Sequence, residues 1–290
     1  MLAPQSAPSA QPHSQYITHY ENFPVASWLC PPRLRPAVAA IYWFARTADD
    51  IADEGDATPL QRLDELAAYR VDLLSAAAGA PHSGRWPQVF DPLAAVLTQF
   101  KLPIALLTDL ISAFEQDIAK SRDAAGYANQ TELLDYCSRS ANPIGRLLLH
   151  LYGITDAASL QLSDQICSAL QLINFWQDLS QDLPRGRFYL PTEDCAQFGV
   201  TQADLLALNQ TPAATTLIAS QATNARAMMQ KGSPLVHRIP GRAGWELRLV
   251  VQGGLRILDK IATLDHAMLI HRPKLGKTDA LIVFWRSLWM

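Results

Sequence analysis

The chain has 290 residues, of which 49% are apolar and 18% are charged, so it is long and apolar enough to bury a large core. Its formal net charge is −3, and it has no basic stripe, so a nucleic acid is not an expected partner. The four cysteines are scattered without a Cys-x-x-Cys pair, which argues against a zinc site or a disulfide framework and fits a reducing, cytoplasmic compartment.

Residues 1–15 are rich in Pro, Ser, Ala and Gln and contain neither a basic segment nor an apolar segment. They do not resemble a secretory signal, and we expect them to form a disordered tail. Residues 16–290 are predicted to form a single domain, because no irregular stretch within them resembles an interdomain linker. No uninterrupted apolar stretch is long enough to span a membrane.

Most of this domain has the apolar spacing of helices, and strand patterns are almost absent. Prolines and N-cap residues mark several starts, such as Thr58-Pro59. The expected helices cover roughly 36–54, 58–78, 91–100, 102–121, 131–152, 163–182, 202–209, 213–231 and 242–266. The sequence therefore predicts an all-α domain of about nine helices.

The first of these helices ends in an acidic cluster in which Asp49 and Asp53 share one face. The helix expected at 163–182 ends in a second cluster, in which Asn174, Asp178 and Asp182 share a face. Both clusters lie near a helix C-terminus, where the macrodipole disfavours a carboxylate by roughly 0.3–1 kcal/mol. They are either solvated helix faces or ligands for a compensating cation, and Mg²⁺ is the natural candidate for paired carboxylates.

Arginines accompany both clusters. Arg46 lies one turn before Asp49, and Arg185 and Arg187 follow the second cluster directly. Guanidinium groups bind phosphate oxygens in a bidentate manner, so these residues could hold a diphosphate. Alternatively, Arg185 and Arg187 solvate a loop or offset the charges of the second cluster.

Two further segments leave alternatives open. The helix expected at 131–152 is interrupted by Asn142-Pro143 and Gly145, which indicate either a kink that borders a cavity or an ordinary junction between helices. The apolar C-terminal segment 280–290 is either a strand or helical turn docked on the core, or a contact with a membrane surface. Nothing in the sequence defines an oligomeric state.

Several other catalytic layouts are missing. The sequence has no nucleophile elbow, no P-loop, no His-Glu-x-x-His and no dinucleotide-binding glycine pattern.

At residues 45–54 and 171–191 the chain resembles the squalene/phytoene synthase family, and the resemblance extends from about His19 to the C-terminus. It implies an all-α isoprenoid synthase fold, a helical bundle with two Asp-rich motifs across a central cavity, and Mg²⁺ with an isoprenoid diphosphate substrate. By position, the residues that match the cation and diphosphate site are Arg46, Asp49, Asp53, Gln171, Asn174, Asp178 and Asp182, and Tyr42 is expected on the same cavity wall. The second motif also contains the candidate substrate-binding residues Arg185, Arg187 and Tyr189.

Within the family, the segments 20–27, 140–145 and 253–258 resemble the hydroxysqualene synthase branch of bacterial hopanoid pathways. The family typically has Val-Ala-Gly where this chain has Ser140-Ala141-Asn142, and carotenoid-type members have a tyrosine at the position of Gly254. A basic residue often precedes the second motif's first Asp, where this chain has Gln177. The resemblance implies ionisation of presqualene diphosphate and capture of the cation by water, which Asn142 or another polar residue at the kink would orient.

Two other functions remain open from the sequence. One is head-to-head condensation of two prenyl diphosphates, to squalene, presqualene diphosphate or a carotenoid precursor. The other is a non-catalytic helical assembly factor, although such a protein would have little need for both acidic clusters.

Overall fold

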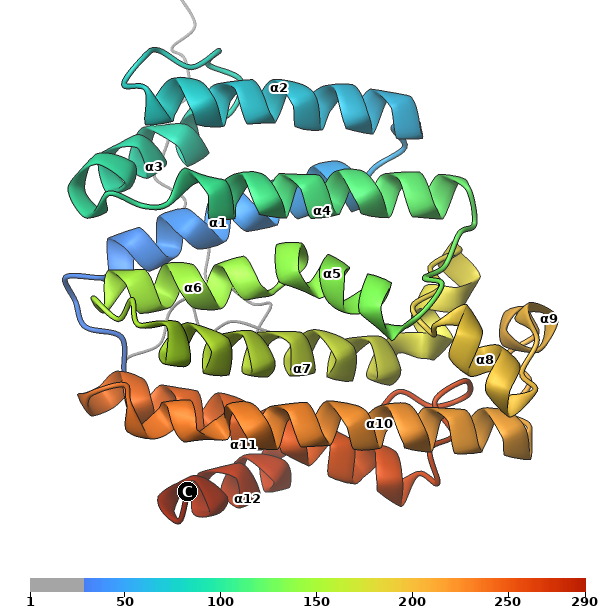
Figure 1. The fold of residues 1–290 in the computed structure, drawn as a ribbon. Coiled ribbons are helices and arrows are strands. Elements are labelled where there is room, and N and C mark those ends of the chain that lie inside the picture. Colours follow the sequence, from blue (N-terminus) through green and yellow to red (C-terminus); the bar gives the residue numbers. More distant parts are fainter. Residues whose placement is uncertain (1–28) are drawn as a thin grey trace, which may run out of the picture.

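The computed structural model describes residues 29–290, so the expected tail at 1–15 and the segment 20–27 lie outside it. In the described part every regular element is a helix, which confirms the all-α prediction (Figure 1). The α-helices are α1 (Arg35–Asp53), α2 (Pro59–Ala77), α3 (Pro87–Phe100), α4 (Ile104–Arg122), α5 (Gln130–Ser140), α6 (Asn142–Leu151), α7 (Ala157–Asp182), α8 (Thr192–Phe198), α9 (Gln202–Leu206), α10 (Pro212–Gly232), α11 (Gly241–Thr263) and α12 (Lys277–Leu288). Two short 3₁₀ turns are η1 (Leu183–Arg185) and η2 (Ser233–His237).

The observed helix boundaries differ from the expected ones in three places. The stretch 131–152 forms two helices, α5 and α6, which are separated at Ala141. Helix α7 begins earlier than expected because the carboxylate of Asp156 accepts a hydrogen bond from the backbone N–H of Ser159. Helix α8 lies in a stretch expected to be irregular; it follows Pro191 and ends at Gly199, whose φ is +71°.

The C-terminal apolar segment forms helix α12 rather than a strand. The buried carboxylate of Asp279 anchors this helix, because it accepts hydrogen bonds from Arg256 Nε and Lys260 Nζ of α11, each at 2.7 Å. It also accepts one from the backbone N–H of Gly276 at 2.8 Å. No helix in the described residues combines the length and the hydropathy needed to cross a bilayer.

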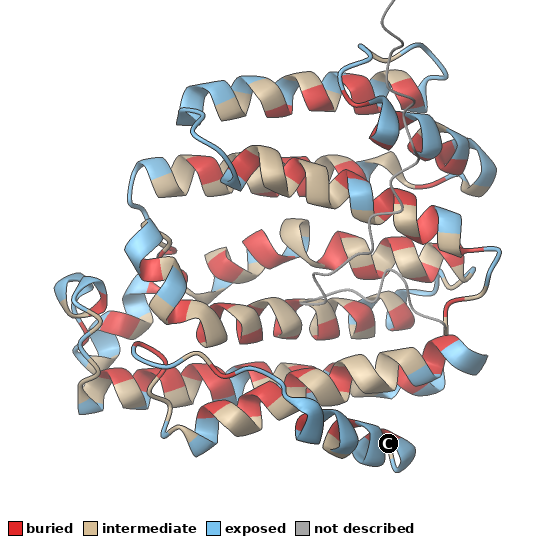
Figure 2. Cartoon of the chain, turned by 180° about the vertical axis from the view of Figure 1, so that it is seen from behind, coloured by how far each residue is buried: buried red, intermediate tan, exposed pale blue. Residues whose placement is uncertain are grey.

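The hydrophobic core has two parts, which face each other across the middle of the molecule. Helices α1, α2, α3 and α4 surround the first part, which contains Phe44, Tyr69 and Phe90. Helices α5, α7, α10 and α11 surround the second part, which contains Trp176. In Figure 1 the helices form layers from α2 and α3 at the top to α12 at the bottom, and Figure 2 shows buried residues on the inward faces of these layers.

Two glycines allow helices to approach closely between these layers. A Cβ atom on Gly145 of α6 would lie 2.4 Å from Ser163 Oγ and 2.5 Å from Cys167 Sγ of α7. A Cβ atom on Gly254 of α11 would lie 3.0 Å from Met229 Cε and 3.1 Å from Leu170 Cδ2. A side chain at position 254 would therefore require the side chains of Met229 and Leu170 to move aside.

Candidate active site

A cavity of about 340 Å³ lies between the two parts of the core. Its wall comes from α1, α4, α5, α6, α7, η2 and α11 and is largely apolar; it includes Ile41, Phe114, Leu148, Ile166 and Leu247. The charged side chains in the wall are Arg46, Asp49 and Glu246. A cavity of this size and composition suits a ligand that is mostly hydrocarbon and carries a charged group.

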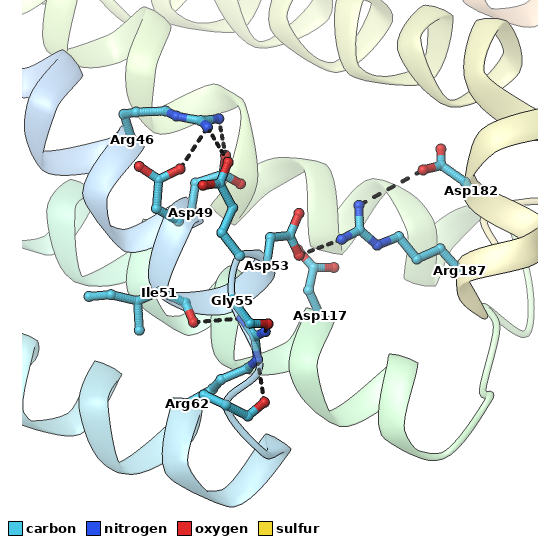
Figure 3. Close-up of polar contacts among 12 residues, drawn as sticks. Arg46, Asp49, Ile51, Asp53, Gly55, Arg62, Asp117, Asp182 and Arg187 are labelled. Carbon is cyan, nitrogen blue, oxygen red and sulfur yellow. Dashed lines mark hydrogen bonds and ion pairs between the residues drawn. The ribbon is translucent and has the colours of Figure 1, made fainter.

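The first carboxylate cluster lies in the last turns of α1, on the helix face that also carries Arg46. Arg46 Nη1 lies 2.9 Å from Asp49, and its Nη2 lies 2.6 Å from Asp50 and 2.8 Å from Glu54 (Figure 3). One guanidinium group therefore contacts three carboxylates.

Arg62 of α2 provides hydrogen bonds to backbone carbonyl groups at the C-terminal end of α1 and does not pair with these acids. Its guanidinium donates hydrogen bonds to the carbonyls of Ile51 at 3.0 Å and Gly55 at 2.7 Å (Figure 3). Helix C-termini leave carbonyl groups without intrahelical partners, and a cation there also opposes the macrodipole. This contact explains how α1 can end in a run of acids.

The second cluster lies at the end of α7. Both oxygens of Asp178 accept hydrogen bonds from Arg272, from Nε at 2.6 Å and from Nη2 at 2.9 Å. The neighbouring Gln177 side chain donates to the carbonyl of Pro273 at 2.7 Å, which fixes the segment that carries Arg272. Sequence reasoning missed Arg272, because nothing in the local pattern connects it with a carboxylate 94 residues earlier.

Arg187 lies between the two clusters. It forms an ion pair with Asp53 of α1, and its Nη1 lies 3.9 Å from Asp182 of α7 (Figure 3). The structure thus brings the acidic ends of α1 and α7 opposite each other, with a guanidinium group between them. Asp53, Asp182 and Arg187 are the sequence-predicted residues that this arrangement joins.

Sequence reasoning also missed Asp117 of α4, which lies near Asp53 and Arg187 (Figure 3). The Tyr136 hydroxyl of α5 donates a hydrogen bond to its carboxylate at 2.6 Å. Burial raises the pKa of Asp117 to about 7, and the hydrogen bond from Tyr136 opposes that rise. The sequence contained a signal for Asp117, namely an acidic residue on the apolar face of a helix. Helical spacing from the buried Leu110 and Ala113 places it there.

The two clusters carry more negative than positive charge. Six carboxylates, those of Asp49, Asp50, Asp53, Glu54, Asp178 and Asp182, share ion pairs with three arginines. Burial, together with Asp53, raises the pKa of Asp49 to about 6. Burial also raises the pKa of Asp182 to about 6, and Asp178 adds to that rise while Arg187 opposes it. Ionised carboxylates are thus disfavoured in this region, and a bound cation would offset that cost.

The residues of both clusters fit Mg²⁺ by their chemistry, since carboxylate and amide oxygens are the ligands that this ion takes in proteins. No three acidic, His or Cys side chains of the described residues converge closely enough to hold a metal ion, and guanidinium groups lie among the carboxylates instead. The case for Mg²⁺ at this site therefore depends on the type of donor atoms and on the excess negative charge of the two clusters.

The remaining predicted residues lie at different distances from the cavity. Tyr42 and Gln171 line it, and Asn174 is half-buried on the face of α7 that carries Asp178. Arg185 is exposed in η1. Tyr189 is buried outside the cavity wall, where its ring stacks on Phe175 with 3.7 Å between centroids.

Asn142 does not belong to the cavity wall, contrary to the expectation that it orients water there. Its side chain is buried between α6 and α7, where its Oδ1 accepts a hydrogen bond from Ser168 Oγ at 2.9 Å. Ser140 and Ala141 line the cavity at the break between α5 and α6. The hydroxyl of Ser140 has no hydrogen-bond partner among the described residues, so it is the other polar residue at the kink that the sequence left open.

The chain is similar to known proteins over most of its length. Residues 18–279 match the family model for squalene/phytoene synthase. A hydroxysqualene synthase of Sinorhizobium fredii is 34% identical over 254 residues, which is 87% of this chain and 82% of that protein. A presqualene diphosphate synthase of Rhodopseudomonas palustris is 30% identical, over 90% of this chain and 91% of that protein. The crystal structure of a squalene synthase from Alicyclobacillus acidocaldarius superposes with a TM-score of 0.77 at 36% identity, covering 86% of this chain and 90% of that one.

Proposed function

The chain belongs to the squalene/phytoene synthase family of isoprenoid synthases, and from this premise we propose that it converts presqualene diphosphate and water into hydroxysqualene and diphosphate. The observation that carries the proposal is the position of the two acidic helix ends, opposite each other beside a largely apolar cavity. The hydroxysqualene synthase from Sinorhizobium fredii supports the choice of reaction.

In this proposal Asp49 and Asp53 of α1, with Asn174, Asp178 and Asp182 of α7, hold Mg²⁺. The bound ion supplies positive charge for the departing diphosphate. Arg46, Arg185 and Arg187 bind phosphate oxygens, and Gln171 and Tyr42 contact the substrate from the cavity wall. Tyr189 supports this region through its stack on Phe175. Charge develops on the leaving group during ionisation, so cations fixed at this point stabilise the transition state more than the bound substrate.

The apolar wall would shelter the resulting carbocation from bulk water. One water molecule must still reach it, add through its oxygen and lose a proton. Ser140 is the residue that we propose for holding this water, because it lines the cavity and its hydroxyl has no protein partner in the described residues. The hydroxyl oxygen is buried, so it would turn toward the cavity to bind the water. Asn142 is less suited, because its side-chain oxygen already accepts from Ser168.

The test is to identify the products that the purified full-length protein forms with Mg²⁺. We expect presqualene diphosphate alone to yield hydroxysqualene and diphosphate, with oxygen from labelled water in the alcohol. Mass spectrometry of the products, together with a diphosphate assay, measures both. Failure to release diphosphate from presqualene diphosphate would refute the proposal.

A second candidate is condensation of two farnesyl diphosphates to presqualene diphosphate, which the Rhodopseudomonas palustris relative favours. Turnover of farnesyl diphosphate alone, without turnover of presqualene diphosphate, would support it. The assembly-factor alternative is not retained, because the family and its named relatives are enzymes.

A further inference from the structure

Helix α12 exposes an unusually apolar outer face. Its exposed large side chains are Leu281 (72%), Phe284 (56%), Trp285 (60%), Leu288 (40%) and Trp289 (76%), which together are called the α12 apolar face below. Helical spacing places the first four of these on one side. The opposite side, with Val283 and Ser287, is buried against the molecule. Helix α12 therefore exposes its large apolar side chains and buries smaller or polar ones, which is the reverse of the usual amphipathic arrangement.

The α12 apolar face continues onto the outer side of α11. Gln252 of α11 donates a hydrogen bond to Met290 Sδ at 3.5 Å, at the C-terminal end of α12. Trp245 and Arg248 share the helix face of Gln252, and Arg248 lies 5.2 Å from the centre of the half-exposed Trp245 ring. The neighbouring Leu247 lines the cavity. The exposed apolar surface thus extends along a helix whose other side forms the cavity wall.

Exposed positive charge lies beside this surface. Residues 266–290 contain four basic residues, of which Arg272 pairs with Asp178 and Arg286 pairs with Asp259. The exposed positive charge beside the α12 apolar face therefore comes from Lys274 and Lys277. Asp279 is buried and paired, whereas Lys274 and Lys277 are exposed just before α12. Tryptophan and phenylalanine beside exposed lysines form the pattern that binds anionic lipid interfaces.

We propose that the α12 apolar face binds the surface of an anionic lipid bilayer. Trp285 and Trp289 then lie at the boundary between headgroups and acyl chains, and Lys274 and Lys277 lie at the lipid phosphates. A second copy of the chain is the less favoured occupant, because a symmetric contact through this face would bring two basic segments together. Binding to a bilayer would also place α11, which forms part of the cavity wall, next to the lipid phase in which apolar molecules dissolve.

Vesicle flotation of the full-length protein tests the proposal without any substrate, so its result is independent of the proposed reaction. We expect binding to vesicles of phosphatidylcholine and phosphatidylglycerol that exceeds binding to phosphatidylcholine alone and falls with added salt. Replacing Phe284, Trp285 and Trp289 together with Ser should weaken partitioning at least about tenfold. Lys274→Gln with Lys277→Gln should remove the preference for phosphatidylglycerol.

The matched control replaces three exposed apolar residues of α2, Leu60, Val71 and Leu74, with Ser. This variant should float like the wild type, and circular dichroism confirms that each variant is folded. Absence of wild-type binding, or equal losses in both triple variants, would overturn the proposal. It would also be overturned if light scattering showed a dimer that dissociates in the α12 variant while no protein binds vesicles, because a second copy would then be the occupant.

Discussion

Replacing Asp182 with Asn should stabilise the metal-free protein while it abolishes turnover. The Asp182 side chain is 14% exposed, and its ion-pair partner Arg187 is 3.9 Å away. The last turn of α7 contains no basic residue. Burial raises the pKa of this carboxyl to about 6, from an ordinary value of 3.8. The folded state therefore binds a proton more tightly than the unfolded state does, and the ionised side chain destabilises the fold.

The sign of the pH dependence follows from this shift. The contribution of Asp182 to stability is most favourable below about pH 4, falls as the pH rises through the range from 3.8 to about 6, and stays lower above it. The shift corresponds to an upper limit of about 3 kcal/mol. We expect about 1 kcal/mol from Asp182→Asn at pH 8, because water and side-chain movement screen part of the charge. In a chain of 290 residues that gain raises Tm by about 1.5–2 °C.

The assay is thermal unfolding with a chelator between pH 4 and pH 8, with Asp178→Asn as the matched variant one turn earlier on α7. Asp178 accepts two hydrogen bonds from Arg272, so its replacement should lower the free energy of unfolding by about 1–3 kcal/mol. The two variants should therefore shift Tm in opposite directions at pH 8. A lower Tm for Asp182→Asn at that pH would show that this carboxylate serves the fold, and the reasoning would be wrong.

Three further predictions concern the same site and its support. Arg272→Gln should reduce turnover at least about tenfold with an unchanged circular dichroism spectrum, because the guanidinium fixes Asp178; unchanged turnover would refute this. Gly145→Ala should lower the free energy of unfolding in urea by about 1–3 kcal/mol, because its Cβ would meet two atoms of α7, and a negligible change would show that they move aside easily. Mg²⁺ affinity, measured by calorimetry, should fall below about pH 6 as protons compete at Asp49 and Asp182; equal affinity at pH 5 and pH 8 would contradict this.

The sequence predicted those parts of the site that depend on helical spacing. Asp49 and Asp53 are four residues apart, as are Asp178 and Asp182, so a helix is enough to place each pair on one face. Arg46 follows from the same rule, and the ion pairs with Asp49 and Asp50 agree with it.

The parts that depend on tertiary packing were not predictable in this way. Arg272 reaches Asp178 from 94 residues away, and Asp117 meets Tyr136 across two helices. The surroundings of Asn142 were also not predictable, because the sequence shows a break near this residue but not which side chain turns toward the cavity. Packing of α6 on α7 decides that point, through the hydrogen bond from Ser168.

The division of the core leaves a boundary between its two parts, which is called the seam below. Helix α6 contributes Leu147 and Leu151 to one part of the core and Leu149 to the other, and the cavity lies beside it. A hydrocarbon ligand bound in the cavity would contact both parts of the core and add van der Waals contacts between them. The occupied protein should then unfold as one cooperative unit, whereas the empty protein can loosen first along this seam.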